Sequence, residues 1–234
     1  MIHQLIFAAP RPGLTEKEFC DYWVHRHAVD FAAKIPQIRR YVVDTRVPFG
    51  PDDENPPWSG VAEIWLRDEA DQLASLQTPE FLDGARRDEP RWAAFWRTVA
   101  LDTEPHELAG SEPLSAGRSW VKVFWLAKRR AGIPLETFRR YALAVHQPLL
   151  GELPGVRRVV QGHVRDGAYA VGEAVLDVAF QLWFDSPDAV ATALDSAEYA
   201  AVAADHDRFL DPRHRHQLVT RENWVIGPTF RETT

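Results

Sequence analysis

The sequence predicts an α+β fold in which two ferredoxin-like βαββαβ repeats pack their sheets into one intrachain α+β barrel. The first observation is an internal repeat, in which Gly13, Phe19, Tyr22, His27 and Pro36 are matched by Gly132, Phe138, Tyr141, His146 and Pro154. The second is the order of hydrophobic patterns in each half, which reads strand, helix, two strands, helix and strand. The third is physical: a sheet with helices on one face leaves its other face bare, and the second copy is the simplest cover.

The first half shows these elements in order. A strand at 5–9 leads through Gly13 into a helix, for which Thr15 and Glu18 form a capping box. The apolar side chains of this helix recur at helical spacing. Pro36 lies beyond the helix end. Strands are predicted at 41–47, 61–66 and 98–101, with a Pro- and Asp-rich loop at 48–59 and a second helical region after the third strand.

The second half repeats this order. Strands are predicted at 120–127, 159–164, 178–184 and 223–226. Pro134 is placed in the first turn of the first helix, and Ser186 caps a second helical region whose first residue is Pro187. The segment between the halves is rich in Pro, Gly, Ser and Glu. The predicted repeats are therefore residues 1–103 and 119–234, joined by a linker at 104–118.

Composition narrows the function. The formal net charge of −7 argues against a nucleic-acid partner, which needs a basic face. The single cysteine, Cys20, excludes an intrachain disulfide and is interpreted as buried filler. No signal-peptide pattern and no bilayer-length apolar run occurs, so a cytoplasmic protein without a membrane partner is expected. The histidine spacings and the absence of a Gly-rich phosphate loop predict neither a metal site nor a nucleotide cofactor.

One motif resembles a known family. The pattern Gly-Leu-Thr-x-x-x-Phe-x-x-Tyr-Trp-x-x-x-His-Ala from Gly13, followed by Ile-Pro-x-Ile-Arg-Arg-Tyr from Ile35, resembles the EthD-like group of the dimeric α+β barrel superfamily. The second half matches less well. The resemblance implies the barrel fold and a small hydrophobic substrate held between sheet and helices. Relatives isomerise lactones, cyclise, dehydrate or decarboxylate polyketides, oxidise phenols without a cofactor, or handle haem.

The repeated histidines are the leading catalytic candidates. His27, and its counterpart His146, are predicted to end a helix on the face that meets the sheet, where a desolvated imidazole can abstract a proton next to a carbonyl. The alternative is a structural histidine that caps the helix C-terminus. The resemblance implies that Tyr41 belongs to the pocket, where its phenol can donate to an enolate oxygen. Val159 stands at the corresponding place, so the two pockets are expected to have diverged.

Other residues are candidates for substrate binding. Glu63 and Gln181 are polar positions within apolar strands, and each points either into a cavity or to a solvated edge. The aromatic candidates line pockets or simply pack in the core. They are Tyr22, Trp23, Trp65, Tyr141 and Trp183.

These observations predict a cofactor-independent lyase or isomerase. The substrate would be a small aromatic, lactone or polyketide-like carbonyl compound, and the reaction a cyclisation, dehydration, decarboxylation or double-bond migration of secondary metabolism. Two alternatives remain open. One is a cofactor-free monooxygenase of phenols or a haem-binding relative, and the other is a non-catalytic protein that binds a hydrophobic ligand. Further pairing of the fused chain into a homodimer is left open.

Overall fold

The computed structural model describes residues 1–50 and 56–232, so part of the loop predicted at 48–59 lies outside the described residues. The chain divides into two compact units. Unit 1 contains Met1–Asp102, Ser115–Gly117 and the segment that begins at Thr220. Unit 2 contains Thr103–Leu114 and Arg118–Val219.

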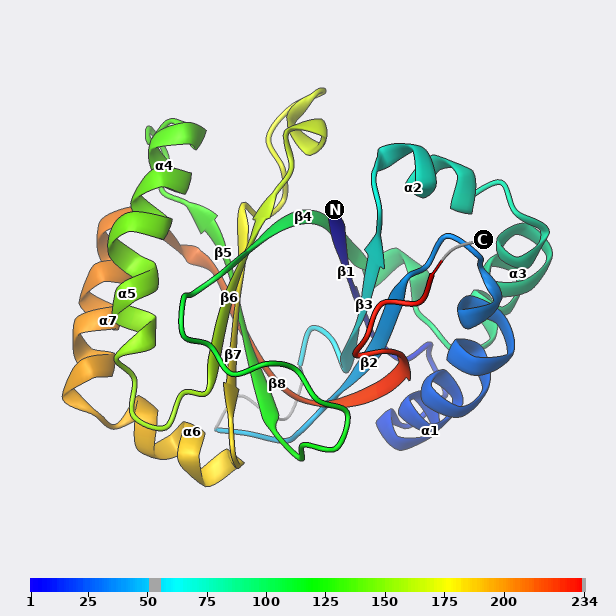
Figure 1. Cartoon of the computed structure of the whole chain (residues 1–234), viewed down its shortest axis with the longest axis horizontal. Coiled ribbons are helices and arrows are strands. Elements are labelled where there is room, and N and C mark those ends of the chain that lie inside the picture. The colour runs from blue at the N-terminus through cyan, green and yellow to red at the C-terminus, as the bar shows by residue number, and fades with distance from the viewer. Residues whose placement is uncertain (51–55, 233–234) are drawn as a thin grey trace. The chain divides into compact units, whose positions relative to one another are not determined.

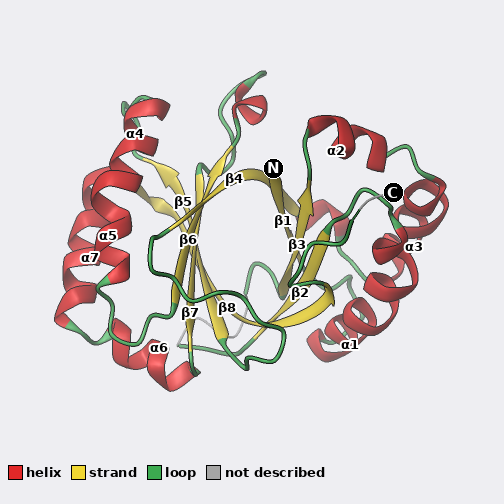
Figure 2. Cartoon of the chain, in the orientation of Figure 1, coloured by secondary structure: helices red, strands yellow, loops and turns green. Residues whose placement is uncertain are grey.

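Unit 1 is an antiparallel sheet with its helices on one face (Figures 1 and 2). Strand β3 (Gly60–Leu66) lies between β1 (Ile2–Ala8) and β2 (Arg40–Arg46), and the end of β8 (Leu210–Ile226) pairs with β2 from Thr220 to Ile226. The helical segments are α1 (Glu16–Tyr22), η1 (Trp23–Phe31), η2 (Ala32–Lys34), α2 (Glu69–Ser75), η3 (Glu80–Ala85), α3 (Arg86–Asp88), η4 (Glu89–Arg91) and η5 (Phe95–Arg97).

Unit 2 repeats this plan. Strand β7 (Val178–Phe184) lies between β5 (Val121–Arg129) and β6 (Arg158–Val164), and the end of β4 (Val99–Glu107) pairs with β6 from Thr103 to Glu107. The helical segments are α4 (Leu135–Tyr141), η6 (Ala142–His146), α5 (Gln147–Gly151), η7 (Asp166–Tyr169), α6 (Pro187–Leu194) and α7 (Ala197–Phe209). The predicted α+β class and its two ferredoxin-like repeats are confirmed.

Local signals account for the helix starts. The Thr15 side chain accepts from the Glu18 N–H and the Glu18 carboxylate accepts from the Thr15 N–H, which confirms the capping box. Ser186 caps α6, with Pro187 as the first helical residue. Pro134, predicted inside the first turn of its helix, is instead the extended cap residue before α4.

Two sequence predictions about element ends were wrong. His27 does not end its helix, because the helix continues as the π-helical segment η1 to Phe31. His146 is likewise followed directly by α5. The final strands are also longer than predicted, because β4 runs to Glu107 and β8 begins at Leu210. The first residues of the predicted linker are therefore strand.

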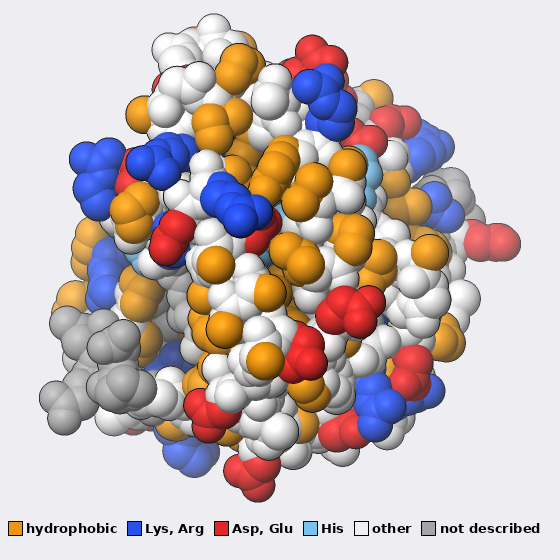
Figure 3. Space-filling model, turned by 90° about the vertical axis from the view of Figure 1, so that its left-hand side faces the viewer, with side chains coloured by type: hydrophobic (Ala, Val, Ile, Leu, Met, Phe, Trp, Pro, Cys, Tyr) orange, Lys and Arg blue, Asp and Glu red, His pale blue; other side chains and the backbone are white. Residues whose placement is uncertain are grey.

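Each unit has its own packed interior between sheet and helices. In unit 1 the aromatic side chains of Phe19, Trp23 and Trp92 pack together with ring centroids 4.9–5.3 Å apart. Cys20 is partly buried, and burial raises the pKa of its thiol to about 12, which fits filler and not a nucleophile. Over the helices of unit 2, apolar side chains lie among charged ones of both signs (Figure 3). None of the helices in residues 1–50 and 56–232 has the length and hydrophobicity to cross a lipid bilayer.

Candidate active site

A hydrogen-bonded set of three side chains joins two helical segments of unit 1. Asp88, at the end of α3, accepts from the Tyr22 hydroxyl at 2.8 Å and lies 3.0 Å from Nδ1 of His27. Asp88 is buried, and Arg91 approaches its carboxylate only at 3.5 Å. A carboxylate bonded to Nδ1 fixes the ring and leaves Nε2 for a ligand. No hydrogen bond to Nε2 of His27 occurs within the described part of the chain.

The second repeat contains the same set. Asp205 in α7 accepts from the Tyr141 hydroxyl at 2.6 Å and lies 2.9 Å from Nδ1 of His146. The predicted correspondence of His27 with His146, and of Tyr22 with Tyr141, therefore extends to the aspartates Asp88 and Asp205. The two tyrosines are placed to support the aspartates and are not part of a cavity wall described below.

A cavity of about 230 Å³ lies between the sheet and the helices of unit 1. Three of the predicted site residues, Trp23, His27 and Tyr41, line it. Most of the remaining wall is apolar, which suits a hydrophobic ligand. It includes Ile6, Ala8, Ile35, Ile38, Ala62, Ile64, Leu66, Phe81 and Trp92, with the polar side chains of Gln4, Ser75, Glu89 and Thr98 at separate points.

Burial sets the protonation of the polar groups in this cavity. It lowers the pKa of His27, against the hydrogen bond and charge of Asp88, so the imidazole is neutral at pH 7 and can accept a proton. It raises the pKa of Glu89 to about 7, with Arg86 acting in the opposite direction. It also raises the pKa of the Tyr41 phenol, while a hydrogen bond from Trp23 opposes the shift. The cavity therefore holds one proton acceptor and two groups that can donate.

The corresponding inner cavity of unit 2 is filled. Phe180 stands where the first repeat has Ala62, and its ring packs against His146 with centroids 5.0 Å apart. His206, which follows Asp205 as Glu89 follows Asp88, lies 4.8 Å from the same imidazole. His146 is fully buried, and its Nε2 is closed off from the remaining pocket. Of the two predicted catalytic histidines, His27 lines the cavity of unit 1, and His146 does not line the remaining pocket of unit 2.

Glu63 and Trp65 lie on the other face of the sheet. Side chains alternate along a strand, and it is Ala62, Ile64 and Leu66 that face the cavity. Glu63 instead lies 2.7 Å from Nε2 of His3, whose ring stacks on Trp65 at 4.2 Å. The structure therefore does not bring these two predicted residues to His27.

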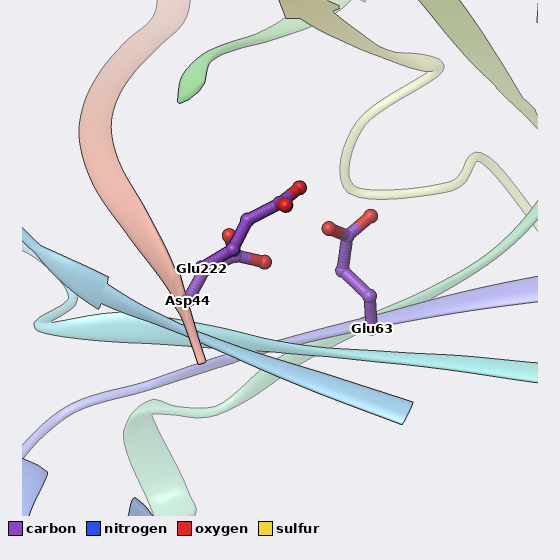
Figure 4. Close-up of side chains that lie close together, drawn as sticks. All are labelled: Asp44, Glu63 and Glu222. Carbon is purple, nitrogen blue, oxygen red and sulfur yellow. The ribbon is translucent and has the colours of Figure 1, made fainter. Parts of the chain in front are cut away.

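Three carboxylates gather on that opposite face. Asp44, Glu63 and Glu222 project from neighbouring strands to the same side of the sheet (Figure 4), with ligand atoms all within 4.8 Å of one another. Oxygen ligands at this spacing can hold a hard cation. Sequence spacing gives no sign of this cluster, because its three residues come from three separate strands.

In unit 2, Gln181 and Trp183 alternate in the same way with Phe180 and do not line the remaining pocket. Trp183 packs with Trp120 and Val160. The sequence analysis missed Asp88, Asp205 and Glu89. The repeat itself was the available signal, because an Asp-x-x-Arg pattern recurs at Asp88 and Asp205.

Comparison with solved structures identifies several proteins of the same fold. An anthrone oxidase-like protein matches with a TM-score of 0.67 and 15% identity, over 95% of this chain and 90% of that one. A Fusobacterium nucleatum protein provisionally described as a monooxygenase matches at 0.63 and 7%, over 98% and 95%. A similarly described protein of Lactobacillus acidophilus NCFM matches at 0.56 and 11%, over 96% and 95%. At these identities the likeness shows the fold alone.

No curated protein matches this sequence significantly. The EthD domain model matches residues 11–95 and again residues 130–213. These ranges carry both Tyr–Asp–His sets and cover most of the chain. The chain therefore belongs to the EthD family, with two copies of the domain.

Proposed function

We propose that the cavity of the first repeat is the active site of a lyase or isomerase that acts on a small hydrophobic carbonyl compound. The proposal rests on the environment of the His27 side chain. Its Nδ1 is held by Asp88, its pKa is lowered by burial, and its ring forms part of an apolar cavity wall. Neutral imidazole in such a place is suited to general base catalysis.

The proposed reaction moves one proton. Nε2 of His27 removes a proton from the carbon next to the carbonyl, and the Asp88 carboxylate stabilises the imidazolium that forms. Tyr41 or protonated Glu89 donates a hydrogen bond to the carbonyl oxygen, on which negative charge develops. Return of the proton to another carbon migrates the double bond, and loss of hydroxide from the β-carbon of the enolate, with the proton held by His27 returned to it as water forms, completes a dehydration. In a decarboxylation the enolate forms instead when carbon dioxide leaves a β-keto acid, and a proton on His27 then passes to the enolate carbon. A positioned base supplies about 10²–10⁴ in rate.

The test begins with native mass spectrometry of freshly purified protein to identify a retained compound. Its turnover is then measured with wild type and with His27→Gln, and His146→Gln serves as the control because it has the same local contacts without a cavity. We expect His27→Gln to lower kcat by at least about 10² and His146→Gln to leave it within about twofold. Equal rates for wild type and His27→Gln would remove His27 from the mechanism, and unchanged binding without any turnover would favour a ligand-binding protein.

A second candidate function is the cofactor-free oxidation of a phenolic compound. The names of the structural relatives, an anthrone oxidase-like protein and two proteins provisionally described as monooxygenases, favour this chemistry. The same base would remove a phenolic proton, and the electron-rich anion would pass electrons to dioxygen. Oxygen uptake during turnover in a sealed electrode cell distinguishes it from the proton-transfer reaction, which consumes none.

A further inference from the structure

The second repeat contains a pocket of about 210 Å³, and most of its lining residues correspond to residues that line the first cavity. When the two repeats are aligned, Trp125 of this pocket corresponds to Ile6 of the first cavity, Tyr199 to Phe81 and Leu210 to Ala93. The residues that correspond to His27 and Tyr41 do not line this pocket, because Phe180 fills the space beside His146. The second pocket is therefore a shortened copy without the base.

The polar groups of the two pockets differ in charge. Where the first cavity has Glu89, the second has His206, and where the first has Thr98, the second has Arg215. Nε2 of His206 and Nε of Arg215 are buried and make no hydrogen bond to any described residue. His206 is 8% exposed. Buried polar nitrogens without partners are rare, and two on one pocket indicate a polar ligand group there.

Aromatic rings form the rest of this pocket. The Trp125 ring lies 5.8 Å from that of Tyr199 and 5.8 Å from that of His206, edge-on to the latter. Trp125 is held in place because its indole N–H donates to Oε1 of Gln217 at 2.8 Å. Such walls bury a flat ring with little loss of side-chain freedom.

The charged groups around the pocket favour an anion. Arg215 makes one ion pair, from Nη2 to the exposed Asp207 carboxylate at 2.8 Å, and Nη2 also lies 3.4 Å from the Leu210 carbonyl oxygen. His216 lines the same pocket, and burial followed by the charge of His214 lowers its pKa. His206 is neutral at pH 7, because burial lowers its pKa to about 3. Arg215 is thus the fixed positive charge that a ligand carboxylate meets.

We propose that the pocket of the second repeat binds a small planar aromatic carboxylate, with its ring against Trp125 and Tyr199 and its carboxylate on Arg215. The ring of Phe180 separates this ligand from His146, so the second repeat binds without catalysing. The site is distinct from the first cavity, where a carboxylate ligand would meet Glu89 instead of an arginine.

The experiment is isothermal titration calorimetry with 1-naphthoate as the probe. Arg215→Thr restores the residue of the first repeat, and we expect it to weaken binding by about tenfold or more through loss of a charge-assisted contact. Arg213→Thr is the matched control, because Arg213 is exposed, pairs with Asp211 and does not line the pocket. It should leave affinity unchanged. Asp207→Asn removes the competing carboxylate and should tighten binding.

A further variant, Ala62→Phe, shows which of the two pockets the probe occupies. It fills the first cavity as Phe180 fills the second repeat, and 1-naphthoate binding should persist in it. Failure of wild type to bind the probe, equal affinity of Arg215→Thr and wild type, or loss of binding in Ala62→Phe would each overturn the proposal. None of these outcomes depends on turnover, so they are independent of the role proposed for His27.

Discussion

Asp88 and Asp205 each bind a tyrosine hydroxyl and a histidine nitrogen. His27 lines the cavity of its repeat, whereas His146 does not line the pocket described in the second repeat. The shared hydrogen bonds therefore have a structural role in both repeats, since each ties the first helix to the second helical region. The chemistry proposed for the first repeat depends on the space beside His27. The duplication supplies a built-in control for every substitution in this set.

Asp88→Asn tests the role of the aspartate. We expect kcat/KM to fall at least about tenfold, because the amide stabilises an imidazolium less well than a carboxylate does. The Asp88 carboxylate opposes the lowering of the His27 pKa, so its removal should also move the acid limb of the pH–rate profile to lower pH. Asp205→Asn is the matched control and should retain both the rate and the profile. An unshifted limb in Asp88→Asn would show that Asp88 acts only in folding.

Only part of this set could be predicted from sequence. His27 and Tyr41 lie within one recognisable motif, whereas Asp88 lies 61 residues from His27 and its counterpart 59 residues from His146. That change of spacing hides the match between the aspartates. Glu63 was misplaced for another reason: strand periodicity tells that neighbouring residues face opposite ways, but not which face meets the helices.

At the level of elements, the helix that carries His27 depends on its first turn. Thr15→Ala removes the capping box and should lower the free energy of unfolding by about 1 kcal/mol. Thr192→Ala is the comparison, because the exposed Thr192 hydroxyl only donates to the Asp188 carbonyl within α6, and a change within about 0.5 kcal/mol is expected. Urea denaturation measures both. Equal changes in the free energy of unfolding would mean that the capping box stabilises the helix no more than the Thr192 hydroxyl stabilises α6.

The corresponding strands of the two repeats, β3 and β7, differ at one decisive position. Ala62→Phe should abolish binding of the retained compound, because the ring occupies the cavity beside His27. Phe180→Ala should cost about 3–5 kcal/mol of stability and open space beside His146. Isothermal titration calorimetry measures the affinity and stoichiometry of binding. If Ala62→Phe bound the compound with wild-type affinity, the compound would bind outside the first cavity.

Element order could be predicted from the repeat, but element length could not. The remaining residues of β4 and β8 are mostly charged or polar, so only the first few residues of β4 and the last few of β8 were recognised as strand. Pairing with β6 supplies the backbone hydrogen bonds of Thr103–Glu107 in β4, and pairing with β2 supplies those of β8 from Thr220 onward. The π-helical turn at Trp23–Phe31 has no sequence signature at all.

For the whole molecule, buried neutral histidines link stability to pH. Burial lowers the pKa values of His27, His146, His163 and His206, so the unfolded chain binds more protons than the folded one below pH 6.5. These groups cost no stability well above pH 6.5. As the medium is acidified, each group lowers the stability by up to about 1.4 kcal/mol per pH unit, until the pH passes the pKa of that group in the folded chain. Glu89 acts in the opposite direction between pH 4.5 and 7, because its pKa is raised.

A difference measurement isolates one of these groups. His163→Gln removes a histidine whose pKa burial lowers to about 3, and its stability should fall less steeply than that of wild type from pH 6.5 to 4.5. Denaturant unfolding at several pH values gives the two slopes. Parallel slopes would show that His163 is protonated equally in the folded and unfolded chain.

The most direct test of the central claim is a crystal structure of the protein with its retained compound. We predict density between the sheet and helices of the first repeat, with an acidic carbon of the compound within hydrogen-bonding reach of Nε2 of His27 and its carbonyl oxygen near Tyr41 or Glu89. Density against Asp44, Glu63 and Glu222 on the opposite face of the sheet, with the first cavity unchanged, would contradict the account.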